Sequence, residues 1–380
     1  MVLLRRWLNR GIGRGPWRIA PFEEIRCQRA GYAAGVHRAE DFTGVVECAP
    51  GEITPYGAAD ALLGQPPTWE ELSGGPRYRE QGIAFGEPKL LFSLMDACVA
   101  GTEGLVYCPH ARAAVAETVR RWTEPAIEHP FLRAPGYPGP QELPGRTLCL
   151  LTLSGEGFYH FLLEVIPRLH LAANWLGEVD HVLANGAAGG FHERWLVQAG
   201  VPREKIVWAE GFAHFRCEQL LFTSHLMRDQ QPSHWTVTAL RTQLRFTPAL
   251  EVTAKIWISR GDANIRRLAW ENEIVSQLPG FELVELTRLA PSEQIKLFSR
   301  CRAVAGAHGA GLAQVAFCPP GAHLFEIFPH PSRQPIYHRL ASLAGVHYHW
   351  AMLDFARQER LPELGARIRA ALASDEHPHP

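Results

Sequence analysis

Two residues that could exchange a proton with a substrate lie in the segment from Gly155 to Leu169, where His160 is followed four positions later by Glu164. This spacing places both side chains on one face of a helix. Because the segment is otherwise apolar on nearly every side, we expect the pair to be buried. An imidazole and a carboxylate that tune each other's pKa could accept a proton from a hydroxyl group. A purely structural pair would show the same spacing, so the pattern leaves both interpretations open.

A second group could bind an anion. An apolar strand predicted at Lys255–Ser259 runs directly into Arg260, and Arg266 and Arg267 follow in the next loop. The ends of strands in α/β sheets are ligand positions, and a guanidinium can hold a phosphate group through two parallel hydrogen bonds. A basic loop that only faces water is the alternative. Asn272 and Glu273, at the start of the next helix, could orient this loop.

A third group is a glycine-rich turn between an apolar strand, Arg302–Ala307, and a short helix, Leu312–Phe317. Gly306, Gly309 and Gly311 crowd this turn, and His308 lies within it. Free backbone N–H groups and the helix dipole would make such a turn an anion site. The glycine spacing is the reverse of the dinucleotide fingerprint, and no Gly-Lys-Ser/Thr of a P-loop follows. A plain tight turn remains the alternative.

One acidic residue follows the turn. Glu326 lies in the middle of the next apolar strand, Leu324–Phe328. Acidic residues at this place in doubly wound folds take the hydroxyl groups of a ribose. An ion pair with Arg302 or Arg333 would explain the same residue without a ligand.

The elements that must position these groups alternate regularly from residue 146 onward. Strands and helices follow one another, with a break at Thr247–Thr253. Such alternation is typical of parallel sheets with helices on both faces. We therefore expect two Rossmann-like, doubly wound α/β domains, 146–250 and 251–380, that face a cleft where the strands end. One long helix is predicted at Phe158–Leu176, with a kink at Pro167.

Residues 1–145 are rich in proline and glycine and are predicted as an irregular, β-rich region that ends in a linker or a long loop at Ala134–Pro144. The expected elements are strands at Gly44–Cys48, Gly82–Phe85 and Leu105–Cys108 and a helix at Ala111–Trp122.

Composition excludes several classes of function. The chain has 380 residues and a net charge of −1, so no overall field attracts nucleic acid. No Asp-x-Asp pair is present to hold a divalent ion, and His347 and His349 lack a metal-ligating partner at a suitable spacing.

No apolar stretch reaches the ~18 residues of a spanning helix. With no signal peptide, we expect a cytoplasmic protein. Residues 1–20 carry several arginines and one apolar helical face, which would allow peripheral membrane contact or form a frayed terminus.

Taken together, the motifs resemble glycosyltransferase family 61, which contains bacterial capsular polysaccharide biosynthesis proteins and eukaryotic xylosyl- and N-acetylglucosaminyltransferases. The resemblance covers about residues 145–330. Its motifs are Phe158–Leu169, Ile258-Ser259-Arg260, Arg266-Arg267, Asn272-Glu273, Ser292–Phe298, Gly306–Leu312, Pro320-Gly321 and Glu326–Pro329. Their order and joint spacing are specific, although each motif alone is not.

The family resemblance implies a GT-B-like arrangement and an inverting transfer of a hexose or pentose from a nucleotide sugar to a hydroxyl of a glycan or glycolipid acceptor, as in capsular, exopolysaccharide or lipopolysaccharide biosynthesis. It also implies a nucleotide-binding C-terminal domain, with no divalent metal or other cofactor expected. The implied donor-site residues are Ser259, Arg260, Arg266, His308, Gly309, Gly311 and Glu326, and the acceptor-side residues are His160 and Glu164. The oligomeric state is left open.

One departure from the family concerns the base. Many bacterial relatives carry aspartate where this chain has Glu164, so the base stays open among Glu164, His160 and His308. A non-catalytic module that binds a nucleotide sugar is the alternative function.

Overall fold

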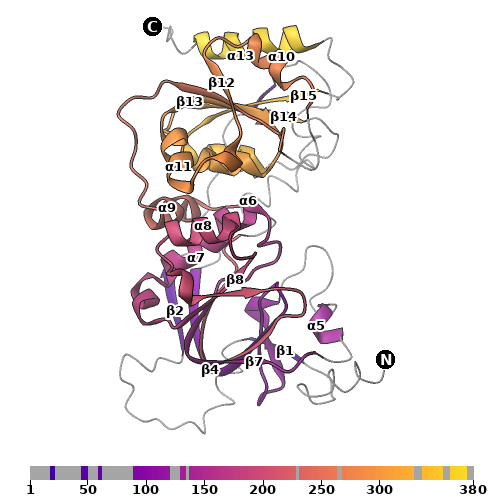
Figure 1. Ribbon diagram of the computed structural model, residues 1–380, viewed down its shortest axis with the longest axis vertical. Coiled ribbons are helices and arrows are strands. Elements are labelled where there is room, and N and C mark those ends of the chain that lie inside the picture. Colours follow the sequence, from indigo (N-terminus) through magenta and orange to yellow (C-terminus); the bar gives the residue numbers. More distant parts are fainter. Residues whose placement is uncertain are drawn as a thin grey trace. The chain divides into compact units, whose positions relative to one another are not determined.

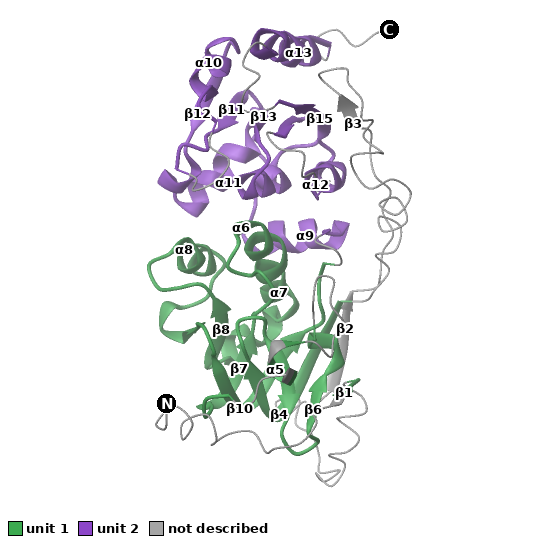
Figure 2. Cartoon of the chain, turned by 90° about the vertical axis from the view of Figure 1, so that its right-hand side faces the viewer, with its two compact units in different colours: residues 1–51, 87–229 green, residues 52–86, 230–380 purple. Residues whose placement is uncertain are grey.

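The computed structural model describes residues 18–21, 44–49, 59–61, 89–119, 129–133, 137–227, 231–262, 268–328, 336–353 and 360–374. The chain divides into two compact units (Figure 2). Unit 1 comprises Met1–Gly51 and Glu87–Asp229, and unit 2 comprises Glu52–Gly86 and Gln230–Pro380. Each unit is built around its own β-sheet, so the predicted mixed α/β fold with two sheets is confirmed.

The sheet of unit 2 is parallel throughout its described strands. Its strands are β3 (Ala59–Ala61), β11 (Ala254–Ile258), β12 (Phe281–Val284), β13 (Cys301–Ala307), β14 (His323–Phe328) and β15 (His347–Met352), in the order β12-β11-β13-β14-β15-β3. Apart from β3, this is the 2-1-3-4-5 order of one class of doubly wound sheet. The direction of winding reverses between β11 and β13, so a ligand site is expected where these two strands end.

Helices cover both faces of this sheet (Figure 1). The helices of unit 2 are α9 (His234–Gln243), α10 (Glu271–Ser276), α11 (Pro291–Ser299), α12 (Ile336–Ala344) and α13 (Leu361–Ser374), with the 3₁₀ helices η7 (Leu286–Arg288) and η8 (Ala310–Phe317). On one face, Trp257, Ala305 and Phe325 form a core with apolar residues of α10 and α13. Since side chains alternate along a strand, Glu326 points to the opposite face, which α11 and α12 cover.

The sheet of unit 1 is mixed. Its described strands are β1 (Arg18–Ala20), β2 (Gly44–Ala49), β4 (Lys89–Ala100), β5 (Leu105–Cys108), β6 (Ala113–Val115), β7 (Gln141–Cys149), β8 (His181–Asn185), β9 (Ile206–Ala209) and β10 (His214–Thr223). Their order is β1-β6-β5-β4-β10-β7-β8-β9, with β2 paired to β4. The parallel part, β10-β7-β8-β9, also reverses its direction of winding, between β7 and β10.

The helices of unit 1 are short. They are α5 (Pro130–Arg133), α6 (Phe158–His160), α7 (Ile166–Leu171) and α8 (Phe191–Gln198), with the 3₁₀ helices η2 (Ala116–Thr118), η5 (Ala173–Glu178) and η6 (Arg203–Lys205) and the π-helix η4 (Phe161–Val165). The long helix predicted at Phe158–Leu176 is therefore wrong in detail. Pro167 has no backbone N–H and its ring crowds the preceding turn, and the N–H of Ile166 bonds five residues back, to the carbonyl of Phe161.

The predicted boundary at residue 145 has no counterpart in the observed units. Strand β4, which the sequence did not reveal, pairs with β10 over nearly its whole length. The helix predicted at Ala111–Trp122 is wrong, because Ala113–Val115 forms the buried strand β6. Strands at Leu105–Cys108 and Gly44–Cys48 are confirmed, whereas Gly82–Phe85 lies outside the described residues. The end of the predicted linker, from Gln141 onward, belongs to β7.

The predicted boundary at residue 250 also differs from the observed division between Asp229 and Gln230. The reason is α9, which belongs to unit 2. Its Arg241 donates hydrogen bonds from Nε to the carbonyl of Ala316 (2.7 Å) and from Nη2 to that of Cys318 (2.9 Å). These contacts cap the end of η8, so α9 packs with the second sheet.

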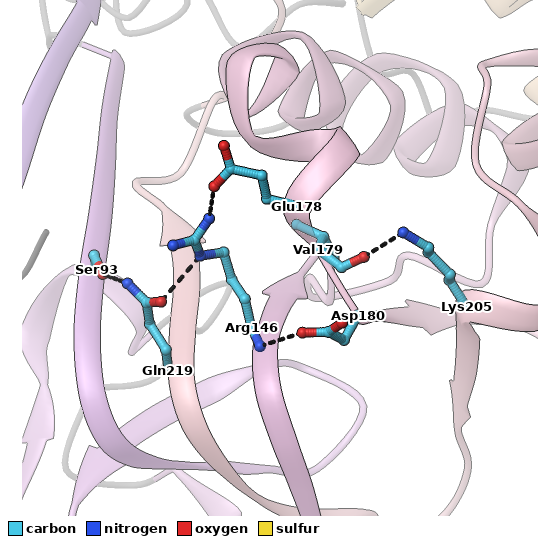
Figure 3. Close-up of polar contacts among 7 residues, drawn as sticks. All are labelled: Ser93, Arg146, Glu178, Val179, Asp180, Lys205 and Gln219. Atoms are coloured by element: carbon cyan, nitrogen blue, oxygen red, sulfur yellow. Dashed lines mark hydrogen bonds and ion pairs between the residues drawn. The ribbon is translucent and has the colours of Figure 1, made fainter. Parts of the chain in front are cut away.

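A polar network around Arg146, in the second half of β7, ties strands of unit 1 together (Figure 3). Arg146 donates its backbone N–H to Asp180 Oδ2 (2.8 Å) and its Nε–H to Gln219 Oε1 (2.9 Å), and its guanidinium pairs with Glu178. Gln219 in turn donates to Ser93 of β4 (3.1 Å). Because these partners lie on or beside β8, β10 and β4, one arginine holds the register of four strands.

Candidate functional site

The strand ends at the reversal point of unit 2 bring two predicted groups together. Arg260 follows β11, and Gly309 follows β13, which is the next strand in the sheet. A Cβ atom added to Gly309 would lie 1.8 Å from Nη1 of Arg260. The guanidinium therefore rests against the backbone at the start of η8. A cation and the free N–H groups of a helix start are both suited to an anion.

The other two glycines of the turn serve packing. A Cβ atom at Gly311 would lie 3.1 Å from Leu286 Cδ1 and 3.3 Å from Ile258 Cγ2, and one at Gly306 would lie 3.2 Å from the carbonyl oxygen of Ile258. Both positions are tighter than a side chain ordinarily accepts, so these glycines let η8 and β13 approach β11. A donor-site role for Gly311 stays a prediction.

His308 is held by a buried carboxylate. Its Nδ1 lies 2.5 Å from Oε1 of Glu326, which is fully buried, and the ring stacks on Phe328 and meets the edge of Tyr337. The second oxygen of Glu326 accepts a hydrogen bond from the hydroxyl of Tyr348 (2.6 Å).

This geometry supports a different role for Glu326 than ribose binding, because both of its oxygens are engaged inside the protein. The contact fixes the orientation of the His308 ring, with Nδ1 facing the carboxylate.

Ser259 and Arg260 are anchored by a residue that the sequence did not single out. The Ser259 hydroxyl donates to Oε2 of Glu271 (2.9 Å) and accepts from the N–H of Gly261 (3.0 Å). Burial raises the pKa of Glu271, although hydrogen bonds from Arg260, Ser259 and Trp257 act in the opposite direction. Arg266, the other arginine predicted for the donor site, lies outside the described residues together with Arg267.

In unit 1, His160 and Glu164 come together at the end of β7. The Nδ1 of His160 lies 3.5 Å from Oε2 of Glu164, and the buried Arg168 lies 3.7 Å from Oε1. Nη1 of Arg168 donates to the carbonyl of Leu151 just beyond β7 (2.9 Å). Glu164 has no exposed surface, whereas His160 keeps 8% of its surface exposed. The histidine is therefore the member of the pair that has surface open to solvent.

The backbone around this pair departs from regular geometry. Glu164 lies inside the π-helix, a feature frequent at functional sites, and Ser154 has a φ of 62° in the loop that precedes α6. Asn185 at the end of β8 accepts from the N–H of Thr152 (3.1 Å) and donates to the carbonyl of Thr102 (2.7 Å). Its fixed side chain joins the ends of β7 and β8.

Sequence reasoning assigned no role to Arg168, Asn185, Glu271 and Tyr348, although Arg168 lies within the quoted motif Phe158–Leu169. Arg168 had a detectable signal, because it follows Glu164 by four residues on the same helical segment. The other three act through partners that are distant in the sequence.

Two further observations concern metals and membranes. Within the described parts of the chain, no three histidine, cysteine or acidic side chains gather so that they could hold a metal ion. His349, considered above as a metal ligand, instead places its Nε2 2.9 Å from Nδ1 of His323.

None of the described helices is both long enough and apolar enough to cross a membrane. Residues 1–17 of the basic terminus lie outside the described residues.

The fold and these strand-end groups are consistent with a glycosyltransferase, and comparison with known families establishes that class. Residues 158–325 match the family described as glycosyltransferase 61. The chain thus carries a glycosyltransferase family 61 domain and is a glycosyltransferase, which confirms the resemblance and the enzyme class. The matched segment begins at α6, includes His160, Arg260 and Gly309, and ends within β14. No curated protein matches the chain.

Proposed function

We propose that this protein is an inverting glycosyltransferase that moves a sugar from a nucleotide-sugar donor to a hydroxyl of a glycan or glycolipid acceptor. The observation that carries the proposal is the contact of the Arg260 guanidinium with the Gly309 backbone, beside His308, where β11 and β13 end. This is where ligands of doubly wound sheets bind.

The donor would be held by its diphosphate. As the bond to the sugar breaks, negative charge grows on the leaving nucleoside diphosphate. In our proposal, Arg260, His308 and the N–H groups at the start of η8 stabilise this charge, so that no divalent metal is required. Glu326 contributes through His308, to which it is hydrogen bonded. Ser259, Arg266 and Gly311 complete the proposed donor site, Ser259 and Gly311 by shaping it.

The acceptor would be activated by His160. Its imidazole takes the proton from the acceptor hydroxyl, whose oxygen forms a bond to the anomeric carbon while the bond from that carbon to the phosphate oxygen breaks. The electron pair leaves with the diphosphate. Glu164, which is buried beside Nδ1 of His160, orients the ring and balances the charge that the ring gains. Arg168 on the other side of Glu164 keeps that carboxylate in place.

We further propose a GT-B-like arrangement, with unit 1 providing the acceptor side and unit 2 the donor side. Its support is that each unit has its own reversal point in a parallel run of strands, and each carries candidate residues where those strands end. The proposed process is capsular, exopolysaccharide or lipopolysaccharide biosynthesis in the cytoplasm. Peripheral membrane contact of residues 1–20 would bring the enzyme to a glycolipid acceptor.

Nucleotide binding tests the proposal. In calorimetry with UDP and GDP, we expect at least one to bind, and Arg260→Ala to weaken it by about 2–5 kcal/mol, which is ~30-fold or more. Arg288→Ala is the matched control, because that side chain is largely exposed on η7. Unchanged affinity in Arg260→Ala would refute the donor-site assignment.

A second assay tests catalysis separately from nucleotide binding. With a panel of UDP- and GDP-sugars, release of the nucleoside diphosphate in the presence of glycan acceptors separates a transferase from a module that only binds the nucleotide sugar. Stabilisation against heat by NAD alone, with no response to UDP or GDP derivatives, would contradict the proposed donor class.

A further inference from the structure

We propose that Glu271 is a positioning residue of the donor site, which fixes the strand end that carries Ser259 and Arg260. This inference rests on the proposed function and extends it to a residue of α10 that belongs to none of the motifs quoted above. Glu271 is the first residue of α10 and is buried, and its carboxylate faces the end of β11.

The carboxylate collects hydrogen-bond donors from the last residues of the strand. The backbone N–H of Arg260 lies 2.9 Å from Oε1 and 3.1 Å from Oε2. The hydroxyl of Ser259 donates to Oε2 (2.9 Å), and the indole N–H of Trp257 lies 3.4 Å from Oε1. All of these groups are donors, and an ionised carboxylate is the side chain that only accepts.

The same hydrogen-bond network also holds the backbone of Gly261. The Ser259 hydroxyl, whose proton points to Glu271, accepts the backbone N–H of Gly261 (3.0 Å). The backbone from Ser259 to Gly261 is therefore held at each residue, directly or through one hydroxyl. Since a guanidinium stands on a long flexible side chain, a fixed backbone restricts where it can reach, and here it rests on Gly309.

Replacing Glu271 by glutamine keeps the shape of the side chain but removes one of its two acceptor oxygens. In Glu271→Gln, one of the two oxygens becomes an NH₂ group, which is itself a donor and faces N–H and O–H donors. A neutral amide also carries no charge that would have to be desolvated at this buried position. We therefore expect the variant to fold, with a loosened strand end.

The first arm of the test needs no ligand. Amide hydrogen exchange of Arg260 is measured in the full-length wild type, in Glu271→Gln and in Glu282→Gln. Glu282 is exposed on β12, the neighbour of β11, and serves as the matched control. We expect exchange at Arg260 to be at least about tenfold faster in Glu271→Gln and unchanged in Glu282→Gln, because only the first replaces one of the two acceptor oxygens that face the Arg260 N–H by a donor.

The second arm measures UDP and GDP affinity of the same three proteins by calorimetry. We expect Glu271→Gln to bind the preferred nucleotide about tenfold more weakly, and Glu282→Gln to bind as the wild type does.

The outcomes separate the two hypotheses. Unchanged exchange at Arg260 overturns the positioning role whatever the nucleotide result. Faster exchange with wild-type nucleotide affinity overturns it too, because Glu271 would then be structural only. A wild type that binds neither UDP nor GDP overturns the proposed donor site, and with it any role of Glu271 there, even where exchange has changed.

Discussion

The Nδ1 of His308 lies 2.5 Å from Oε1 of the fully buried Glu326, whose other oxygen accepts a hydrogen bond from Tyr348. A histidine held in this way keeps one ring orientation, with Nδ1 turned toward the carboxylate. At the lip of the glycine turn, the imidazolium form of such a ring can donate Nε2–H to a departing phosphate while Nδ1–H stays on Glu326. Glu326 would then act on the reaction through His308, without contacting the ligand.

We predict that Glu326→Gln lowers turnover by about 10²-fold, the scale found when one donor that stabilises a developing oxyanion is lost. The amide fills the same space, so the fold should persist. The measurement is the initial rate of nucleoside diphosphate release at saturating donor. Tyr348→Phe removes one hydrogen bond to the same carboxylate and should have a smaller effect in the same direction. Wild-type rates in Glu326→Gln would contradict the role of His308 in leaving-group stabilisation.

Gly309→Ala tests the contact between the turn and Arg260. The added methyl group would meet Nη1 of Arg260, which is the far end of a flexible side chain and can move at little cost. We therefore expect nearly wild-type stability together with a donor KM raised about tenfold or more, because a charge-assisted contact is worth roughly 1.5–3 kcal/mol. Kinetics with varied donor and thermal unfolding are the two measurements.

The control for this substitution is Gly177→Ala in η5, where an added Cβ atom meets nothing within 4 Å. It should change neither donor KM nor stability. Equal donor KM values in Gly309→Ala and the wild type would show that the position of the Arg260 guanidinium against Gly309 is irrelevant to donor binding.

His160→Asn separates the acceptor side from the donor side. If His160 is the base, this variant loses about 10²–10⁴-fold in turnover, while its affinity for UDP or GDP stays that of the wild type. Transfer at normal rates would eliminate His160 as the base.

Glu164→Gln should behave differently from His160→Asn. It removes the carboxylate beside the buried Arg168, and breaking a buried charge pair costs about 3–5 kcal/mol. We expect a lower unfolding temperature as well as slower turnover, which urea denaturation and rate measurements would show. A variant as stable as the wild type would indicate that the Glu164–Arg168 contact contributes little.

The sequence predicted those helices and strands that are defined by residues close together in the chain. Strands such as β13 and β14 are mostly apolar runs, and glycine or proline ends the helices between them, so the alternation was visible from residue 146 onward. Strand β4 was not predicted, because its identity depends on pairing with β10, more than a hundred residues away. The π-turn before Pro167 was expected only as a kink.

The candidate site could be predicted where the alternation of strands and helices alone places its residues at the ends of strands. Arg260 and Gly309 both follow strands, and the order of the sheet brings these strand ends together. Glu271 could not be recognised, since an acid at the first turn of a helix is common for reasons of the helix dipole alone. Tyr348 and Glu326 meet because β14 and β15 are neighbours in the sheet, a pairing that no spacing in the sequence reveals.

The stability of unit 1 should fall in mild acid, because of three histidines. Desolvation by burial lowers the pKa of His170, His192 and His214 below the ordinary value of 6.5. The unfolded chain therefore binds more protons than the folded one just below that pH. Stability is fully present above pH 6.5 and declines as the pH falls toward the lowered pKa values, with a slope of at most about 1.4 kcal/mol per pH unit for each histidine.

His192→Gln tests one of these contributions. The His192 ring lies 3.1 Å, through Nε2, from the carbonyl of Glu156, and a glutamine amide can donate to the same oxygen without titrating. Urea denaturation between pH 8 and pH 5 should show a shallower loss of stability in this variant than in the wild type. Equal slopes in His192→Gln and the wild type would mean that His192 takes up no extra proton on unfolding in this range.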